Sequence, residues 1–400
     1  MSDHFAYFDH AATTPVAPEV LQAMLPFFAD RYGNPSSRHT MGLDANVALG
    51  EVRRLLAEAV GCSPSMVVFT GSGTEGDVLA LRGSVVGSRR ERHMVVSAIE
   101  HAAILNTARS LERQGHRLTV APVDREGRID VERFVEAVTP ETAVCALMAV
   151  NNELGTIQPI AEVSRRVKEK APRVHFHVDA VQAFVKLPVS FRDWPDVDTI
   201  AVSAHKIYGP KGTGALFLRE AGKLEPVLTG GGQEMGVRSG THNTPGIAGL
   251  GAAYALGRSR RDKDAAHYAA LNRCLLRVLD SKLPDVSVNG PRQAVDLTGS
   301  GPFDRGRVPF LVNLRLPDVP AEPLLNGLEG EGFFVSSGSA CHSKSGSLSH
   351  VLTAIGLSEE DGGSLRLSFG RATTEREIER FADVLGKLVQ RLRQTVARRV

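Results

Sequence analysis

The sequence has few cysteines and little net charge. Four cysteines (Cys62, Cys145, Cys274 and Cys341) lie far apart and form no CxxC pair. This spacing argues against a disulfide framework or a zinc site and favours a reducing compartment. The 47 basic and 45 acidic residues leave a formal net charge of +2, so electrostatics give no case for direct binding to nucleic acid or to a membrane surface.

Long apolar runs are also missing. No uninterrupted apolar stretch is long enough to cross a bilayer. Asp3 and His4 precede any apolar run, so the N-terminus does not resemble a signal peptide. There are no internal repeats and no low-complexity linker. We therefore expect a cytoplasmic protein, and 400 residues suggest two or three domains.

The segment from about Glu51 to Leu218 alternates helical and strand patterns. A helical spacing of apolar residues over 43–60 ends at Gly61, where a left-handed cap is expected. Short apolar runs predict buried strands at 66–70, 93–98, 142–150, 174–179, 199–203 and 215–218, and helices are expected at 102–114 and 160–170. This order predicts an α/β fold whose largely parallel sheet is covered on both faces.

Polar side chains that could do chemistry follow these strands. Thr74, His101, Asn152, Gln182 and His205 each come shortly after a predicted strand. Ligands of open α/β sheets bind at the carboxyl ends of the strands, so we expect these residues to line a site.

The C-terminal part has a different pattern. Residues 246–279 predict a long helix that could bridge two domains, strands are expected at 308–316 and 365–369, and a final helix at about 375–398. This pattern predicts a smaller α+β domain. The basic run at 391–399 fits the solvated face of that last helix better than a binding tail.

Lys206 follows a predicted buried strand and precedes the glycine-containing turn Tyr208-Gly209-Pro210-Lys211-Gly212. In a cleft, partial desolvation would make its amine a usable nucleophile for a Schiff base. A lysine in a surface loop is the alternative.

Asp179 ends the strand predicted at 174–179. A buried carboxylate needs a partner, and the protonated pyridine nitrogen of pyridoxal phosphate (PLP) is one. His175, His177 and Asp179 alternate along this strand and share a face, so a metal site is a second interpretation. No further histidine or carboxylate motif accompanies them, which favours an ordinary strand with satisfied histidines and no metal.

Two small-residue segments complete the set. Thr70-Gly71-Ser72-Gly73-Thr74-Glu75 lies between a strand and a helix, which suits a phosphate but does not fit the Walker pattern. Cys341 lies among serines and glycines in a segment that cannot build a core, beside His342 and Lys344, which would favour its thiolate. We expect a mobile loop with a reactive thiol, and structural roles for the other three cysteines.

Together these segments resemble the cysteine desulfurases of the class V aminotransferase fold over nearly the whole chain. Besides those above, the matching stretches are 7–15 (YFDHAATTP), 33–39 (GNPSSRH), 100–101 (EH), 151–155 (NNELG), 179–182 (DAVQ), 203–206 (SAHK), 238–241 (RSGT), 336–341 (SSGSAC) and 366–371 (RLSFGR). The resemblance implies a PLP-dependent transferase of the aspartate aminotransferase-like fold type I. The implied domains are a large PLP-binding domain at 14–257 and a small domain of 1–13 plus 258–400 that carries the Cys341 loop.

The resemblance also implies a role for each site residue. Lys206 binds PLP covalently, Asp179 pairs with the pyridine nitrogen, and His101 stacks on the ring and shuttles a proton. Gln182 and Asn152 contact the region of the phenolic oxygen. The phosphate is held by Gly73, Thr74, Ser203 and His205, joined by Thr241 from a second subunit. Arg366 clamps the substrate carboxylate, helped by Asn34 and Asn152.

The implied reaction takes sulfur from L-cysteine, holds it as a persulfide on Cys341 and releases alanine. A homodimer is implied, and the length of the loop after Cys341 resembles the mobile-loop branch, which hands sulfur to partner proteins for iron–sulfur cluster assembly or for tRNA or DNA thiolation. Val78, Thr229 and the residues after Cys341 depart from the family's usual sequence and leave the acceptor open. The alternatives are a selenocysteine lyase, a cysteine-sulfinate lyase or an aminotransferase on the same scaffold, and a non-catalytic sulfur-relay partner.

Overall fold

The computed structural model describes residues 5–87, 92–222, 224–299, 303–338 and 348–397. Its centre is a sheet of seven strands in the order β2-β8-β7-β6-β5-β3-β4. The strands are β2 (Val67–Thr70), β3 (His93–Ser97), β4 (Arg117–Ala121), β5 (Thr142–Ala146), β6 (His175–Asp179), β7 (Thr199–Ser203) and β8 (Gly214–Leu218). Strand β8 runs opposite to the other six strands, which are parallel to one another. The predicted α/β fold with a largely parallel sheet is confirmed.

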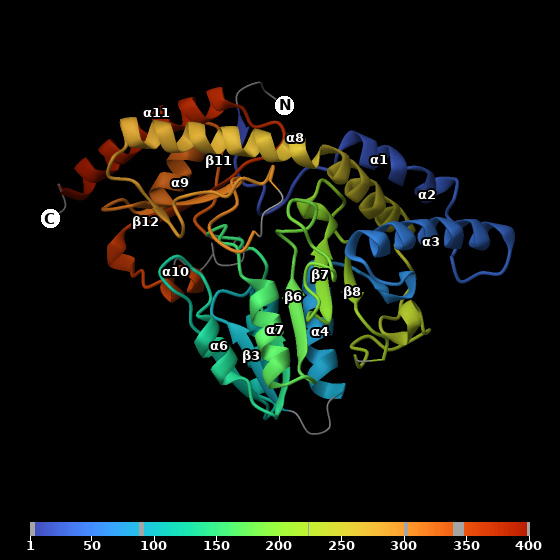
Figure 1. Ribbon diagram of the computed structural model, residues 1–400. Coiled ribbons are helices and arrows are strands. Elements are labelled where there is room, and N and C mark those ends of the chain that lie inside the picture. Colours follow the sequence, from blue (N-terminus) through green and yellow to red (C-terminus); the bar gives the residue numbers. More distant parts are fainter. Residues whose placement is uncertain (1–4, 88–91, 223, 300–302, 339–347, 398–400) are drawn as a thin grey trace.

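Helices cover both faces of this sheet, because its inner strands are apolar on both sides (Figure 1). One face packs against α4 (Gly73–Gly87) and α5 (Ala102–Glu112). The other packs against α6 (Val131–Ala137), α7 (Ile160–Lys170) and α3 (Thr40–Val60). Helix α3 ends as expected at Gly61, whose φ of 74° is left-handed.

A second, smaller sheet lies in the C-terminal part. Its antiparallel strands are β9 (Ser287–Asn289), β10 (Leu311–Leu316) and β12 (Gly363–Ser368), in the order β12-β10-β9. Helices α9 (Ala321–Gly330) and α11 (Glu375–Ala397) pack beside it. The remaining elements are β1 (Ala6–Tyr7), which pairs with β11 (Phe333–Phe334), and the short helices α1 (Pro18–Met24), α2 (Pro26–Ala29) and α10 (His350–Ala354).

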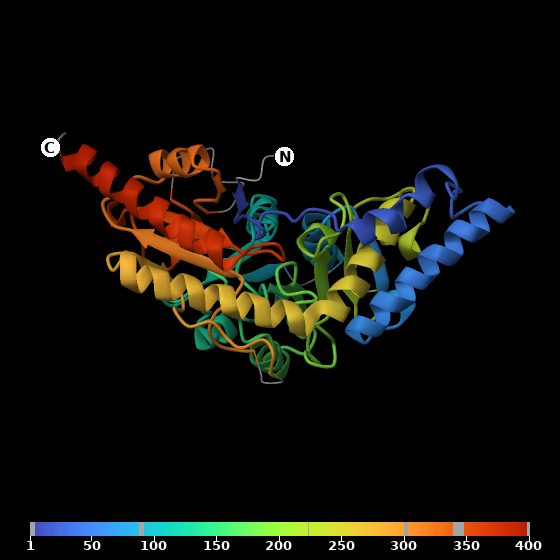
Figure 2. The same cartoon turned by 90° about the horizontal axis from the view of Figure 1, so that it is seen from above.

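Helix α8 (Thr244–Lys282) connects the two parts. It is 39 residues long and bends between the part that contacts α1 and α3 and the part that contacts α11 (Figures 1 and 2). The long bridging helix predicted at 246–279 is therefore confirmed. Residues 257 and 258, where the two predicted domains meet, lie within this helix.

Several strands differ from the sequence prediction. Strand β5 ends at Ala146 rather than Val150, although Leu147 and Ala149 still donate to the carbonyls of His177 and Asp179 on β6. Strand β10 begins at Leu311 rather than Val308, because Pro309 has no N–H for a ladder. The edge strand β4 and the short strands β1, β9 and β11 were not predicted. Within the described residues, no helix has the length and apolar character needed to cross a membrane.

Candidate active site

A cavity of about 270 Å³ lies at the carboxyl ends of β6 and β7, beside the first turn of α4. Most of the residues predicted for the site line it: Gly73, Thr74, His101, Asn152, Asp179, Gln182, Ser203, His205, Lys206 and Arg366. The fold thus gathers side chains that are up to 293 positions apart in the chain (Gly73 to Arg366) at one edge of the sheet, as expected for an open α/β sheet.

Lys206 enters the cavity from a single 3₁₀ turn (Ala204–Lys206) that follows β7. Its amine donates to the carbonyl oxygens of Ala11 and Ala12, at 2.6 and 2.7 Å. The side chain is half-buried rather than on the open surface. The alternative of a surface-loop lysine is therefore wrong, and the amine is positioned for chemistry inside the cavity.

The first turn of α4 forms one end of the cavity. Ser72 caps this 15-residue helix by accepting from the N–H of Glu75 at 3.1 Å. A Cβ on Gly73 would lie 2.6 Å from Val181 Cγ2, so only glycine fits here without displacement. Thr74 and the buried Ser203 add hydroxyls at the same end. Free N–H groups, a helix dipole and hydroxyls together suit a phosphate.

His205 also lines this cavity. Its Nδ1 lies 3.1 Å from the Thr13 hydroxyl. Burial, followed by the positive charges of Lys206, Lys211 and Lys186, lowers its pKa to about 4. The imidazole is therefore neutral near neutral pH, and it acts as a hydrogen-bonding group rather than as a cation.

Asp179, at the end of β6, also lines the cavity. It is buried, and its Oδ1 accepts from the N–H of Val181 at 2.9 Å. Burial raises its pKa, while the charges of His101 and Lys206 and the Val181 N–H act in the other direction. A cationic ring nitrogen at this carboxylate would supply the partner that burial demands.

The strand histidines are satisfied by protein groups. His177 contacts Asp77 Oδ1 at 3.1 Å and the Thr199 hydroxyl at 2.9 Å, and His175 contacts the same hydroxyl at 2.8 Å. Burial lowers the pKa of His177 to about 3 and raises that of Asp77. In the described part of the chain, no group of three or more histidine, cysteine or acidic side chains could hold a metal ion. The contacts confirm the prediction of an ordinary strand.

Arg366 is nearly inaccessible to solvent on β12 and reaches the cavity from the smaller part of the molecule. Its Nη2 pairs with Asp9 Oδ1 at 2.6 Å, and its Nη1 donates to the Asn152 carbonyl at 3.1 Å. Its Nε is buried without a partner among the described residues. The guanidinium is thus held in a fixed orientation and keeps one donor unsatisfied.

His101 caps α5, and its Nδ1 accepts from the N–H of Ala103 at 3.1 Å. With Nδ1 as an acceptor, a neutral ring carries its proton on Nε2. The ring lines the cavity near Asp179, as its effect on the pKa of that carboxyl also shows.

Two predicted residues, Asn34 and Thr241, do not line this cavity, and a third lies outside the described residues. Asn34 is exposed between α2 and α3, where its Oδ1 accepts from the N–H of Ser36. Thr241 is exposed just before α8. Cys341 lies outside the described residues.

The loop that carries Thr241 is anchored by buried charge. Glu234 pairs with Arg53 and with His242, both at 2.6 Å, and accepts from the N–H of Phe69 at 2.9 Å. These contacts lower its pKa to about 2 against the effect of burial. Glu234 and Met235 have positive φ angles of 48° and 58°, which are strained for residues other than glycine.

The sequence did not reveal several cavity residues. Asp9 holds Arg366, Asp77 holds His177, and the carbonyls of Ala11 and Ala12 hold Lys206. Asp9, Ala11 and Ala12 lie in the stretch 7–15 that was singled out for its resemblance. Arg366 is the residue that could have predicted a partner such as Asp9, because a buried arginine needs a carboxylate.

The chain is similar to known proteins over nearly all of its length. The family model described as aminotransferase class-V matches residues 6–381. The chain belongs to the class-V aminotransferase family. A cysteine desulfurase IscS of Clostridium botulinum is 39% identical over 390 residues, covering 97% of this chain and 95% of that protein.

Solved structures of similar proteins have the same fold. A NifS-like protein superposes with a TM-score of 0.87 at 33% identity, covering 97% of this chain and all of that one. A structure described as SspA in complex with cysteine gives a TM-score of 0.76 at 34% identity, covering 91% and 98% of the two chains. These matches confirm the predicted family, the PLP-dependent fold type I and the enzyme class.

Proposed function

We propose that this chain is a PLP-dependent cysteine desulfurase that holds the sulfur of L-cysteine as a persulfide on Cys341 and passes it to an acceptor. One observation carries the proposal. A lysine amine, a buried carboxylate and a capped helix N-terminus converge on one cavity of about 270 Å³, from the ends of adjacent elements.

The residues present fit PLP. The turn at Gly73 leaves room for a phosphate where any Cβ would collide with Val181. Asp179 needs a positive partner, and Gln182 leaves its Oε1 buried without a partner among the described residues. Lys206 would hold the cofactor covalently, Asp179 its ring nitrogen, and Gly73, Thr74, Ser203 and His205 its phosphate. When bound, PLP supplies an electron-poor ring that stabilises negative charge at the substrate α-carbon.

Residues of the chain bind the substrate and move its protons. Arg366, oriented by Asp9 and the Asn152 carbonyl, offers the terminal N–H groups that these two partners leave free to the substrate carboxylate. The amine of Lys206, freed by the arriving substrate amine, removes the α-proton. His101 is placed to take the proton of the substrate thiol.

The Cys341 thiolate then attacks the substrate sulfur. The new S–S bond forms as the carbon–sulfur bond breaks, and its electrons remain on the three-carbon skeleton, which is released as alanine. The sulfur held on Cys341 then passes from the active site to an acceptor. The acceptor belongs to a thiolation or cluster-assembly system that uses persulfide sulfur.

A homodimer is part of the proposal. Phe28, Tyr32 and Val47, on α2, the loop after it and α3, are 61%, 65% and 56% exposed, which is unusual for large apolar side chains and suits an interface. Thr241 and Asn34 lie outside the cavity of their own chain, so we assign both to the cavity of the neighbouring copy. We keep the division into 14–257 and 1–13 plus 258–400, with β1 paired to β11 as support for grouping the N-terminus with the small domain. A cytoplasmic location completes the proposal.

Borohydride reduction of the purified yellow protein, followed by peptide mass spectrometry, tests the assignment of Lys206. The expected result is a phosphopyridoxyl group on Lys206, together with alanine and sulfide from L-cysteine and a reductant. Cofactor fixed to another lysine, or none at all, would refute the assignment. In parallel, Cys341→Ala should abolish persulfide transfer, and Cys62→Ala is the matched control that should retain it.

A further inference from the structure

A second lysine lies behind Lys206. Lys186 follows the turn after β6 and borders two small cavities. One cavity of about 10 Å³ lies between Lys186 and Lys206, and the other, of about 30 Å³, lies between Lys186 and α8. Spaces of this size hold about one or two waters. The two amines therefore face a shared, nearly dry space at the back of the active site.

The Lys186 amine has weak partners. It lies 4.5 Å from the centre of the Phe310 ring and 3.4 Å from the carbonyl oxygen of Gln182. No carboxylate pairs with it in the described part of the chain. The contact with Gln182 leads to Lys206, because the Gln182 amide donates at 2.9 Å to the Ala11 carbonyl that also accepts from Lys206.

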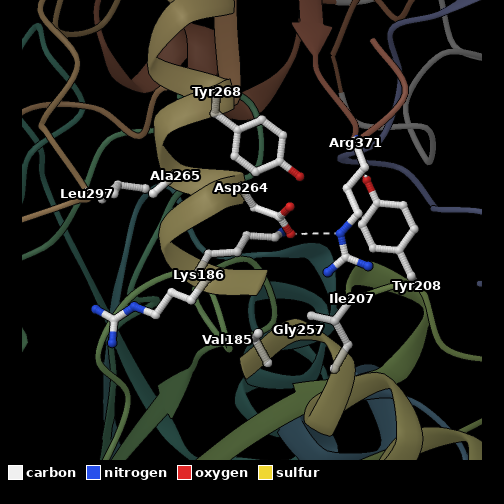
Figure 3. Close-up of a pocket in the computed structure, with 11 residues that line it drawn as sticks. Val185, Lys186, Ile207, Tyr208, Gly257, Asp264, Ala265, Tyr268, Leu297 and Arg371 are labelled. Carbon is white, nitrogen blue, oxygen red and sulfur yellow. Dashed lines mark hydrogen bonds and ion pairs between the residues drawn. The ribbon is translucent and has the colours of Figure 1, made fainter. Parts of the chain in front are cut away.

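Asp264 is the carboxylate among the residues that line these two cavities, and it pairs with other residues. Asp264 on α8 pairs with Arg371 at 2.7 Å, and the Arg371 guanidinium lies 4.1 Å from the centre of the Tyr208 ring. Figure 3 shows Lys186 on the same cavity as this pair. The titratable and charged groups that border the two cavities with Lys186 are His10, Lys206, Tyr208, Arg261, Asp264, Tyr268 and Arg371.

Burial lowers the pKa of Lys186 to about 7, and the charges of Lys206 and Arg371 add to the effect. Lys186 in turn helps burial to lower the pKa of His10 to about 4. The positive charges of the two lysines thus disfavour each other, so Lys186 keeps its ammonium form to higher pH when the Lys206 nitrogen carries no proton.

We propose that Lys186 acts on Lys206 through its positive charge. The Lys186 ammonium disfavours a proton on the Lys206 nitrogen, so this nitrogen can act as a base near neutral pH. A second cation beside a catalytic lysine is a known way to activate its amine. This inference rests on the proposed function, because it requires Lys206 to be the lysine that binds PLP.

The experiment is a pH titration of the purified holoenzyme, followed by the absorption band of bound PLP, which reports the proton on the Lys206 nitrogen. Lys186→Met removes the charge and keeps the length, and should raise the midpoint by about one pH unit. Lys186→Arg keeps the charge and should leave the midpoint near that of the unmodified protein. Lys211→Met changes an exposed lysine in the turn that follows Lys206, and this matched control should cause no shift.

The pH profile of alanine formation gives a second readout. Its acidic limb should move upward with the spectroscopic midpoint in Lys186→Met, whereas the KM for cysteine measured above that limb should stay unchanged. An unshifted midpoint in Lys186→Met, or an equal shift in Lys186→Arg, would overturn the inference. Lys186→Gln replaces Lys186→Met in the same comparison if the methionine variant does not fold.

Failure of the proposed function has a different signature. In that case the unmodified protein itself would carry no cofactor on Lys206. A normal cofactor on Lys206 combined with an unshifted midpoint refutes only the role of Lys186.

Discussion

The strand ends around Lys206 and the loop that carries Thr241 are held by different forces. Asp179 and Ser203 end strands that are buried along their whole length, so packing and ladder hydrogen bonds fix them. The loop has strained backbone at Glu234 and Met235 and depends on the charged contacts of Glu234 with Arg53 and His242. We therefore expect the first region to keep its shape when a charge is removed, and the second to lose stability.

Asp179→Asn tests the strand ends around Lys206 and should have the largest effect of the substitutions proposed. Asparagine keeps the hydrogen bond to the Val181 N–H but cannot supply a negative charge to a ring nitrogen. We expect kcat for alanine formation to fall about 100-fold or more, with the free energy of unfolding maintained. Steady-state kinetics and urea unfolding measure the two quantities.

Asp198→Asn is its matched control, because Asp198 is equally buried but pairs with Lys168 and does not line the cavity. This variant should lose stability and keep kcat. A kcat loss in Asp198→Asn as large as that in Asp179→Asn would contradict the division between the two aspartates.

Glu234→Gln tests the loop that carries Thr241. Removing the charge leaves the largely buried Arg53 without its carboxylate, so the free energy of unfolding should fall by about 3 kcal/mol. PLP should also dissociate more readily from the dimer if Thr241 reaches the neighbour's phosphate. Glu132→Gln breaks an exposed pair with Arg166 and should change neither property measurably.

The contributions of the two regions to stability should be lost in different ranges of acidic pH. His177 has a folded pKa of about 3, below its ordinary 6.5, so the unfolded chain binds the proton first and stability falls as the pH drops from 6.5 toward 3. Glu234 has a folded pKa of about 2, so its contribution is complete above 4.5 and is lost as the pH drops toward 2.

Urea unfolding at a series of pH values measures both windows. His177→Asn should flatten the dependence between pH 6.5 and 4.5, where His10 and His205 keep a smaller slope. Glu234→Gln should flatten it below 4.5 only. Identical profiles for the two variants would count against separate anchoring.

Gly73→Ala should have the smallest effect on folding. Its Cβ would meet Val181 Cγ2 at 2.6 Å, the end of a side chain that can shift, so the helix should survive. Affinity for PLP should fall about tenfold as the phosphate turn is displaced. Gly330→Ala, where a Cβ meets nothing within 4 Å, should leave the affinity unchanged, and fluorescence titration of the apo-protein with PLP compares the two.

Much of this organisation was predictable from local patterns. Lys206, Asp179 and Ser203 follow buried apolar runs, and such runs place polar side chains at one sheet edge whatever the rest of the chain does. The long helix at 246–279 was evident from its spacing. The part of the site that local patterns alone predict is therefore the part built on strands.

What was missed depends on pairing between distant segments. The Asp9–Arg366 contact joins residues 357 positions apart, and no local pattern encodes it. Strand β4 pairs only with β3 and has exposed side chains at the sheet edge, so it lacks the continuous apolar run of an inner strand. Asn34 was assigned through a motif, yet a motif does not state which chain's cavity it serves.

The change of direction in α8 has a structural consequence. Its 39 residues correspond to about 58 Å measured along a helix axis, and that axis turns between the part against α1 and α3 and the part against α11 (Figures 1 and 2). The angle between the two segments therefore sets how the smaller sheet is oriented relative to the larger one. Because Arg366 lies on β12 of the smaller sheet and Lys206 follows β7 of the larger one, the shape of this helix contributes to the distance between the two side chains.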